Sequence, residues 1–215
     1  MNRTDRALFH PRKPFKPWSM LIQALSPWHS IVVVSLTLLS CFSDSLPSMT
    51  LPFVHFDTNM DSPWTPINDG VMGGLSEGQI TLTDSSMRWM GQTRLENNGG
   101  FASVRSPWGH TNLQGMSGVV IRCKGQGGAF KLTLETSQRW WMPYAYASFT
   151  PSGDWQDIVL TTEDFSWSQA QMGDLKKVSP SRELSDVLRV GLMKYDGTAQ
   201  PFDLEIASIE FREEG

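Results

Sequence analysis

Period-two alternation of apolar and polar residues is the feature that most limits how this chain can fold. Phe130, Leu132 and Leu134 are separated by polar residues, and the same pattern recurs in residues 188–192 and 202–206. Successive side chains of a β-strand point to opposite faces, so each run has one face for a core and one for solvent. The pattern therefore predicts half-buried β-strands.

Short apolar runs bounded by glycine, asparagine, aspartate and proline predict further strands. These expected strands cover residues 79–83, 87–95, 101–105, 119–124, 139–150 and 156–160. A helix start is indicated at residues 179–184, where Ser179 can cap and Pro180 can occupy the first turn. Roughly nine strands without alternating helices predict an all-β fold, a jelly-roll β-sandwich of two antiparallel sheets with little helix.

Residues 1–48 differ from the rest of the chain and are treated as a separate segment. Basic residues precede the uncharged apolar run 31–42, an order typical of an export signal or anchor, and Cys41 is a candidate lipidation site. The protein is then exported or membrane-associated through this run alone. In a second interpretation, translation starts at Met49 and the protein is cytoplasmic. In both interpretations, residues 49–215 form one β-sandwich domain.

The charge balance argues against nucleic acid as a partner. Residues 51–215 carry thirteen basic and twenty acidic side chains, so the domain has no long-range attraction for phosphate backbones. Cys41 and Cys123 have no spacing typical of a disulfide framework or a metal site. Cys123 lies in an apolar run and is expected to be a buried strand thiol.

The densest motif is the run of residues 68–76, which predicts a tight irregular loop. Its three glycines permit positive φ, and its polar side chains can bond to nearby backbone. No Gly-Lys-Ser/Thr sequence follows, so a phosphate-binding loop is not predicted. The candidate binding residues in this motif are Asn68, Asp69, Gly73, Gly74 and Ser76.

A second motif, residues 95–105, places a glycine turn directly before an expected strand. Its candidate binding residues are Asn97, Asn98, Gly100, Ser103 and Arg105. The alternative is that the asparagines only shape the turn and Arg105 only pairs with an acidic neighbour. We expect Asn98, Gly100 and Arg105 to lie near residues 70–74 and to form a shared surface or a loop clamp.

An aromatic stretch offers a second candidate surface. Trp140, Tyr144 and Tyr146 share one face of the expected strand 139–150 if that strand is unbroken, whereas an interruption at Pro143 changes the parity. Sugar rings and protein partners both favour exposed aromatic faces. The alternative is that these residues belong to the core of the sandwich.

No catalytic site, metal site or cofactor is predicted. His55 and His110 are the histidines of the domain, and neither lies near a serine or cysteine in a nucleophile motif. Asp57, Asp61 and Asp69 have the oxygen ligands that calcium prefers, but they do not follow the order of an EF-hand. A structural cation at these residues is left as an alternative.

The two motifs, in this order, resemble the signature of the complex I intermediate-associated protein 30 family. Later stretches agree in order and spacing, namely residues 125–128, 146–155, 190–193 and 201–206. The resemblance spans about residues 53–211. The chain departs from the family pattern at Thr161 and Thr162, where a proline-phenylalanine pair is usual, and in residues 166–178.

This resemblance implies a galactose-binding-like sandwich and a chaperone-like role in assembling respiratory complex I. The implied partners are respiratory-complex subunits or assembly intermediates. A carbohydrate-binding module with a glycan partner is the alternative. A groove exposing the aromatic residues would favour a glycan, whereas a broad flat patch over the two motifs would favour a protein.

Overall fold

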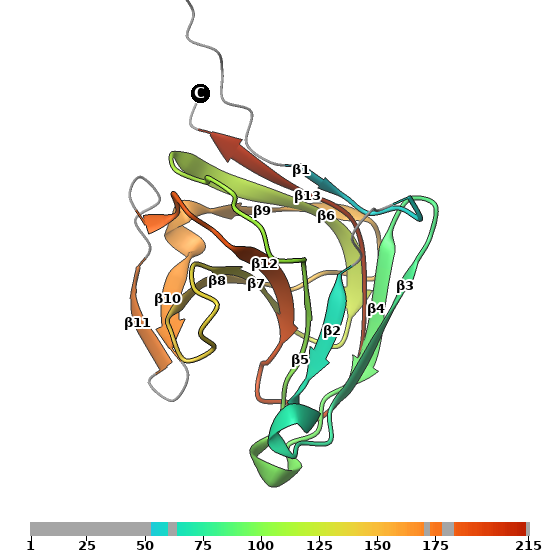
Figure 1. Ribbon diagram of the computed structural model, residues 1–215. Helices are drawn as coiled ribbons and strands as arrows, with labels where there is room; N and C mark the ends of the chain where they lie inside the picture. The colour runs from blue at the N-terminus through green and yellow to red at the C-terminus, as the bar shows by residue number, and fades with distance from the viewer. Residues whose placement is uncertain (1–52, 60–63, 170–172, 178–182, 214–215) are drawn as a thin grey trace, which may run out of the picture. The chain divides into compact units, whose positions relative to one another are not determined.

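The computed structural model describes residues 53–59, 64–169, 173–177 and 183–213 of the chain. Thirteen strands and three short 3₁₀ helices are assigned in these residues, and the strands form two antiparallel sheets (Figure 1). The predicted all-β jelly-roll sandwich with little helix is confirmed. Residues 1–48, including Cys41 and the run 31–42, lie outside the described residues.

Sheet A has the strand order β3-β4-β13-β6-β9, and β1 also pairs with β13. Its strands are β1 (Phe53–His55), β3 (Glu77–Leu82), β4 (Met87–Gln92), β6 (Met116–Gln126), β9 (Gln156–Thr161) and β13 (Pro201–Glu213). The long strand β13 lies in the middle, between β4 and β6.

Sheet B has the strand order β11-β10-β8-β7-β12-β5-β2. Its strands are β2 (Thr65–Asn68), β5 (Ala102–Arg105), β7 (Phe130–Glu135), β8 (Tyr144–Phe149), β10 (Ser166–Gln169), β11 (Gly173–Lys177) and β12 (Arg189–Lys194). Strands far apart in sequence are neighbours here, because β12 pairs with both β5 and β7.

Aromatic side chains connect the two sheets across the core. Trp89 of β4 packs edge to face against Phe202 of β13, with ring centroids 4.8 Å apart, and against Phe130 of β7 at 6.0 Å. All three side chains are buried. A fully buried side chain of this size contributes roughly 1.5–3 kcal/mol to folding, so these contacts fix the inner face of each strand.

The structure corrects two expected strands. The strand expected over residues 87–95 ends at Gln92, and the strand expected over 139–150 begins at Tyr144. A turn precedes Tyr144, because the Met142 amide donates to the Arg139 carbonyl at 3.0 Å and Pro143 has no amide hydrogen. The helix start expected at residues 179–184 lies mostly outside the described residues.

Candidate functional site

A buried carboxylate, Asp69, joins the two sequence motifs. Asp69 begins the 3₁₀ helix η1 (Asp69–Met72) and is 1% exposed. Its Oδ1 accepts a hydrogen bond from the Ser76 amide at 2.8 Å. Its Oδ2 accepts bonds from the amides of Gly100 at 2.7 Å and Phe101 at 3.2 Å. We call this carboxylate with its three amide donors the Asp69 clamp.

The clamp stabilises the ionised form of Asp69. Desolvation by burial acts to raise the pKa of this carboxyl, but hydrogen bonds from Ser76, Gly100 and Phe101 outweigh it and lower the pKa below its ordinary value. The carboxylate therefore acts as an acceptor that holds two loops together.

Glycines and an asparagine complete the joint between the loops. A Cβ at Gly74 would overlap the carboxyl carbon of Asp69, so a larger residue does not fit there. Asn97 belongs to the 3₁₀ helix η2 (Glu96–Asn98), and its side-chain amide donates to the Gly73 carbonyl at 3.0 Å. Gly73 and Gly100 have φ of 88° and 117°, a region that favours glycine. Figure 1 shows η1 and η2 side by side beyond β2 and β5.

Three other polar candidates of the motifs make internal hydrogen bonds through their side chains. The Ser76 hydroxyl accepts a bond from the Arg94 amide at 2.9 Å. The Asn68 side-chain amide donates to the Gly78 carbonyl at 3.3 Å, and the Ser103 hydroxyl donates to the Ile67 carbonyl at 2.7 Å. These contacts connect β2 with β3 and β5.

The expected proximity of the two motifs is confirmed for Gly100 and takes the form of a loop clamp. Asn98 lines one groove with Met72 of the loop 70–74, which is the expected shared surface. Arg105 lines the same groove but is not part of the clamp. It lies at the far end of β5, about 10 Å along an extended strand from Ala102. Its guanidinium instead forms an ion pair with Glu135, the alternative that the sequence left open.

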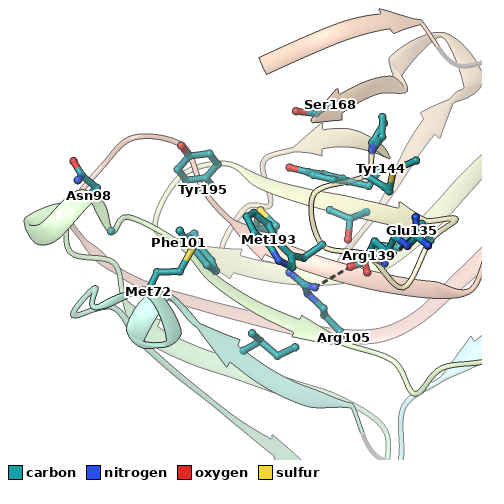
Figure 2. Close-up of a pocket in the computed structure, with 17 residues that line it drawn as sticks. Met72, Asn98, Phe101, Arg105, Glu135, Arg139, Tyr144, Ser168, Met193 and Tyr195 are labelled. Atoms are coloured by element: carbon teal, nitrogen blue, oxygen red, sulfur yellow. Dashed lines mark hydrogen bonds and ion pairs between the residues drawn. The ribbon is translucent and has the colours of Figure 1, made fainter. Parts of the chain in front are cut away.

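A groove of about 740 Å³ lies on the outer face of sheet B, the face turned away from sheet A (Figure 2). Arg105, Thr133 and Met193 line it, and each alternates along its strand with residues of the core. Gly191 lies beneath them in register with Arg105 and Thr133. A Cβ at Gly191 would stand 2.6 Å from the Thr133 hydroxyl, so the glycine leaves space for the Thr133 side chain. These strand residues form the floor of the groove.

Two arginines share one carboxylate in this floor. Glu135 Oε1 lies 3.1 Å from Arg105, and its Oε2 lies 2.7 Å from Arg189. Arg189 also stacks on Trp108, with 3.7 Å between the guanidinium carbon and the ring centroid. Desolvation lowers the pKa of Arg105; Glu135 opposes this shift and Arg189 adds to it. The arrangement leaves an excess of positive charge in a largely desolvated place.

Exposed apolar side chains form the walls of the groove. Met72 of η1 is 67% exposed, Trp140 of the β7–β8 turn is 66% exposed, and Tyr195 after β12 is 48% exposed. Figure 2 shows Met72, Phe101 and Tyr195 gathered toward the Asn98 end of the groove. Because these side chains come from different loops and line one hollow, they are suited to contact a ligand.

The aromatic candidates are only partly brought together. Trp140 and Tyr144 both line the groove, although Trp140 comes from a turn and not from the expected strand. Tyr146 shares the outer face of β8 with Tyr144, with ring centroids 6.3 Å apart, but it lies outside the lining. The Lys131 ammonium lies 4.3 Å from the Tyr146 ring centroid and covers it.

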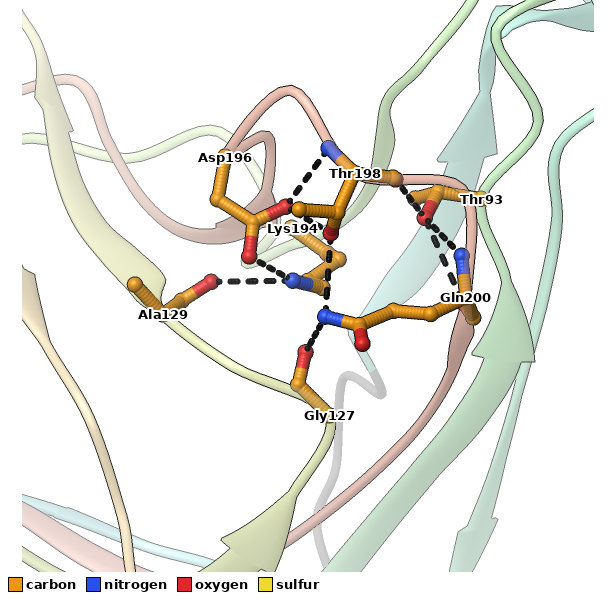
Figure 3. Close-up of polar contacts among 7 residues, drawn as sticks. All are labelled: Thr93, Gly127, Ala129, Lys194, Asp196, Thr198 and Gln200. Atoms are coloured by element: carbon orange, nitrogen blue, oxygen red, sulfur yellow. Dashed lines mark hydrogen bonds and ion pairs between the residues drawn. The ribbon is translucent and has the colours of Figure 1, made fainter.

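A second polar cluster fixes the turn that carries Tyr195 (Figure 3). Lys194 is 0% exposed, and its ammonium forms an ion pair with Asp196 and donates to the Ala129 carbonyl at 3.4 Å. Desolvation acts to raise the pKa of Asp196, but its bonds with Lys194 and Thr198 lower it. The β12–β13 turn is thereby joined to the start of β7.

Sequence reasoning missed several groove residues, among them Met72, Glu135, Met193 and Tyr195. Strand parity carried a signal for two of them, since Glu135 and Met193 alternate with the apolar residues that predicted β7 and β12. Met72 and Tyr195 lie outside the strands, where a period-two pattern does not indicate which way a side chain points.

Other possible sites are less developed. His110 Nδ1 lies 2.7 Å from Asp186, and both side chains are exposed. Within the residues that the structure describes, no three His, Cys, Asp or Glu side chains are grouped to hold a metal ion. No helix in the described parts of the chain is long and apolar enough to cross a bilayer. Cys41 lies outside those parts.

Comparisons with known proteins agree with the fold and with the sequence motifs. A family model described as complex I intermediate-associated protein 30 matches residues 54–206. A comparison with curated proteins found no match. The fold is similar to the family 11 carbohydrate-binding module of a cellulosomal cellulase from Clostridium thermocellum, with a TM-score of 0.55 and 12% identity over 77% of this chain and 98% of that chain. A structure of the Clostridium thermocellum family 11 module with a β-1,3-1,4-mixed-linked tetrasaccharide gives a TM-score of 0.50 and 12% identity over 77% and 97%.

Proposed function

Because the chain belongs to the complex I intermediate-associated protein 30 family, we propose that it is a non-catalytic binding module that assists the assembly of respiratory complex I. The observation that carries this proposal is the open groove on sheet B. Its lining combines Arg105 with the exposed side chains of Met72, Trp140 and Tyr195. Arginine, methionine and aromatic residues are the types enriched where proteins contact each other.

The rigidity of the groove supports a binding role. Its floor is a hydrogen-bonded sheet, and its rims are held by the Asp69 clamp and by the Lys194–Asp196 pair. A surface that is ordered before binding loses little conformational entropy when a partner arrives. Asp69, Ser76 and Asn97 of the motifs are used for this support, which favours a scaffold over a reaction centre.

Co-purification from the organism of origin tests the assembly role. The full chain with a C-terminal affinity tag is isolated from membranes, and co-purifying proteins and the mature N-terminus are identified by mass spectrometry. We expect near-stoichiometric respiratory complex I subunits. Their absence from wild-type preparations would contradict the proposal, and the N-terminal peptide distinguishes lipidation at Cys41 from a start at Met49.

A matched pair of tryptophan variants locates the contact. Trp140→Ala removes an exposed side chain from the groove, whereas Trp155→Ala removes a 38% exposed side chain that packs near Arg122 and Lys124 of sheet A. The recovery of subunits should fall for Trp140→Ala and stay unchanged for Trp155→Ala. Equal recovery from both variants would place the contact elsewhere.

Carbohydrate binding is the second candidate, and the lining of the groove by Trp140 and Tyr144 favours it. Aromatic rings stack on sugar faces and leave the hydroxyls free for polar side chains. Titration with soluble cello- and mixed-linked β-glucan tetrasaccharides, followed by tryptophan fluorescence, tests this role. Saturable quenching that is lost in Trp140→Ala would support it, and unchanged fluorescence would speak against it.

A further inference from the structure

The charged side chains of the groove indicate the sign of the charge on its ligand. Arg105, Glu135 and Arg139 line it, and Arg189 contacts Glu135. Three guanidinium groups thus accompany one carboxylate. The whole chain has a formal net charge of −4, so this local positive excess opposes the charge of the molecule that carries it. An anionic ligand would compensate it.

Arg105 is the group best placed to bind such an anion. Its side chain is 19% exposed, and its Nη1 is engaged by Glu135. A guanidinium carries five N–H donors, so Arg105 can bond a second carboxylate without losing the first. Desolvation and repulsion from Arg189 both act to lower the pKa of Arg105. The opposite charge of a bound carboxylate offsets both effects, as that of Glu135 does.

The flanks of this charged centre are apolar and adaptable. Met72, Met142 and Met193 line the groove together with Phe101 and Tyr195. Methionine side chains adjust to the shape of other apolar side chains. They offer poor hydrogen-bond partners to the hydroxyl groups of a sugar, whose burial without partners is unfavourable. The lining therefore suits hydrophobic side chains on either side of an acidic one.

We propose that the groove binds an extended peptide segment in which a glutamate or aspartate is flanked by hydrophobic residues. The carboxylate lies at Arg105 and Arg139, and the flanking side chains contact the methionines and Trp140. This assignment rests on the proposed function, because it names the part of a partner protein that the groove contacts. Because the groove presents both charged and apolar side chains, it selects for the residues that flank the acidic one as well as for its negative charge.

A peptide array with matched pairs tests this assignment. Acetylated nonapeptides with a central glutamate between hydrophobic residues are compared with counterparts that carry glutamine, using the full chain as the soluble probe. The glutamine peptides lack the charge-assisted bidentate contact with arginine. The best glutamate peptides should therefore bind about tenfold or more tightly than their glutamine counterparts. Binding that is equal for the two sets, or no binding to either, would overturn the proposal.

Variants assign the effect to the groove. Arg105→Met should abolish the preference for glutamate, while Glu135 keeps its pair with Arg189 and the fold is preserved. Arg88→Met removes an arginine that pairs with Asp203 on sheet A and should keep the preference. Glu135→Gln removes the competing carboxylate and should tighten binding of the glutamate peptides. A preference that survives in Arg105→Met with a native unfolding midpoint would contradict the assignment.

The outcomes separate this inference from the assembly role. Respiratory subunits that co-purify equally with wild type and Arg105→Met would overturn the inference and leave the assembly role intact. Peptide binding through Arg105 without co-purifying respiratory subunits would support the inference and contradict the assembly role. Saturable binding of neutral tetrasaccharides in place of the peptides would overturn the peptide assignment and favour the carbohydrate candidate.

Discussion

Replacement of Asp69 by asparagine is the most informative test of how the fold is held together. Asparagine keeps the size of the side chain but replaces one acceptor oxygen with an NH₂ group. That group must face either the Ser76 amide or the amides of Gly100 and Phe101. In every orientation, at least one buried N–H group loses its acceptor.

The expected magnitude follows from these contacts. A buried donor without an acceptor costs about 1–3 kcal/mol, and the remaining bonds lose the contribution of the charge, roughly 1 kcal/mol more. We expect Asp69→Asn to lower the free energy of unfolding by about 3 kcal/mol. For a domain of this size, that corresponds to a decrease in Tm of about 6–12 °C.

The pH dependence provides an independent check on the same group. The pKa of Asp69 is lower in the folded state than its ordinary value, so ionisation of Asp69 stabilises the fold above the unfolded pKa of about 3.9. This contribution is lost as the pH falls through the folded pKa. The difference in unfolding free energy between wild type and Asp69→Asn should therefore shrink below about pH 4.

Equilibrium urea unfolding, followed by tryptophan fluorescence at several pH values, measures both effects. Asp84→Asn is the matched control, because Asp84 is exposed in the β3–β4 turn and its loss should change stability by less than about 0.5 kcal/mol. A loss below about 1 kcal/mol for Asp69→Asn at pH 7, or a difference that does not change with pH, would refute the role assigned to the clamp.

Three further predictions concern the backbone, a buried ion pair and a thiol. Gly74→Ala should destabilise the fold by about 2 kcal/mol or more because its Cβ overlaps Asp69, whereas Gly70→Ala, with open space around it, should be within about 0.5 kcal/mol of wild type in the same urea assay. Lys194→Met should cost about 3 kcal/mol by removing the buried cation that pairs with the Asp196 carboxylate, and part of this loss should return in the double variant with Asp196→Asn. Burial raises the pKa of Cys123 to about 12. Its thiol should therefore resist a thiol-specific chromogenic reagent at pH 8 in the native state and react once urea unfolds the chain. A fast reaction in the native state would contradict its burial.

The sequence was sufficient to predict strands whose inner faces are continuously apolar. Alternation is unambiguous in β7, in β12 and in the first half of β13, where buried residues occupy every second position up to Ile206. A register shift after Ile206 then changes the parity of β13. The strands β2 and β10 carry few such residues and were missed. β4 was expected to extend to Leu95, but the chain turns into η2 instead, which a period-two pattern does not reveal.

The candidate site was harder to predict for a topological reason. Both sequence motifs are rich in residues that bond to the backbone, and the structure uses Asp69, Ser76 and Asn97 in that way. The groove forms because β12 lies between β5 and β7, which brings Arg105 and Glu135 together from distant parts of the chain. No local pattern specifies which strands become neighbours.

We propose that this chain assists the assembly of respiratory complex I through the groove on sheet B. The most direct measurement is the amount of assembled NADH:ubiquinone oxidoreductase, resolved by native gel electrophoresis of membranes from a deletion strain. We predict a reduced amount of the complete complex, restored by the wild-type chain and by Arg88→Met but not by Arg105→Met. A normal amount of complete complex in the deletion strain would contradict this assembly role.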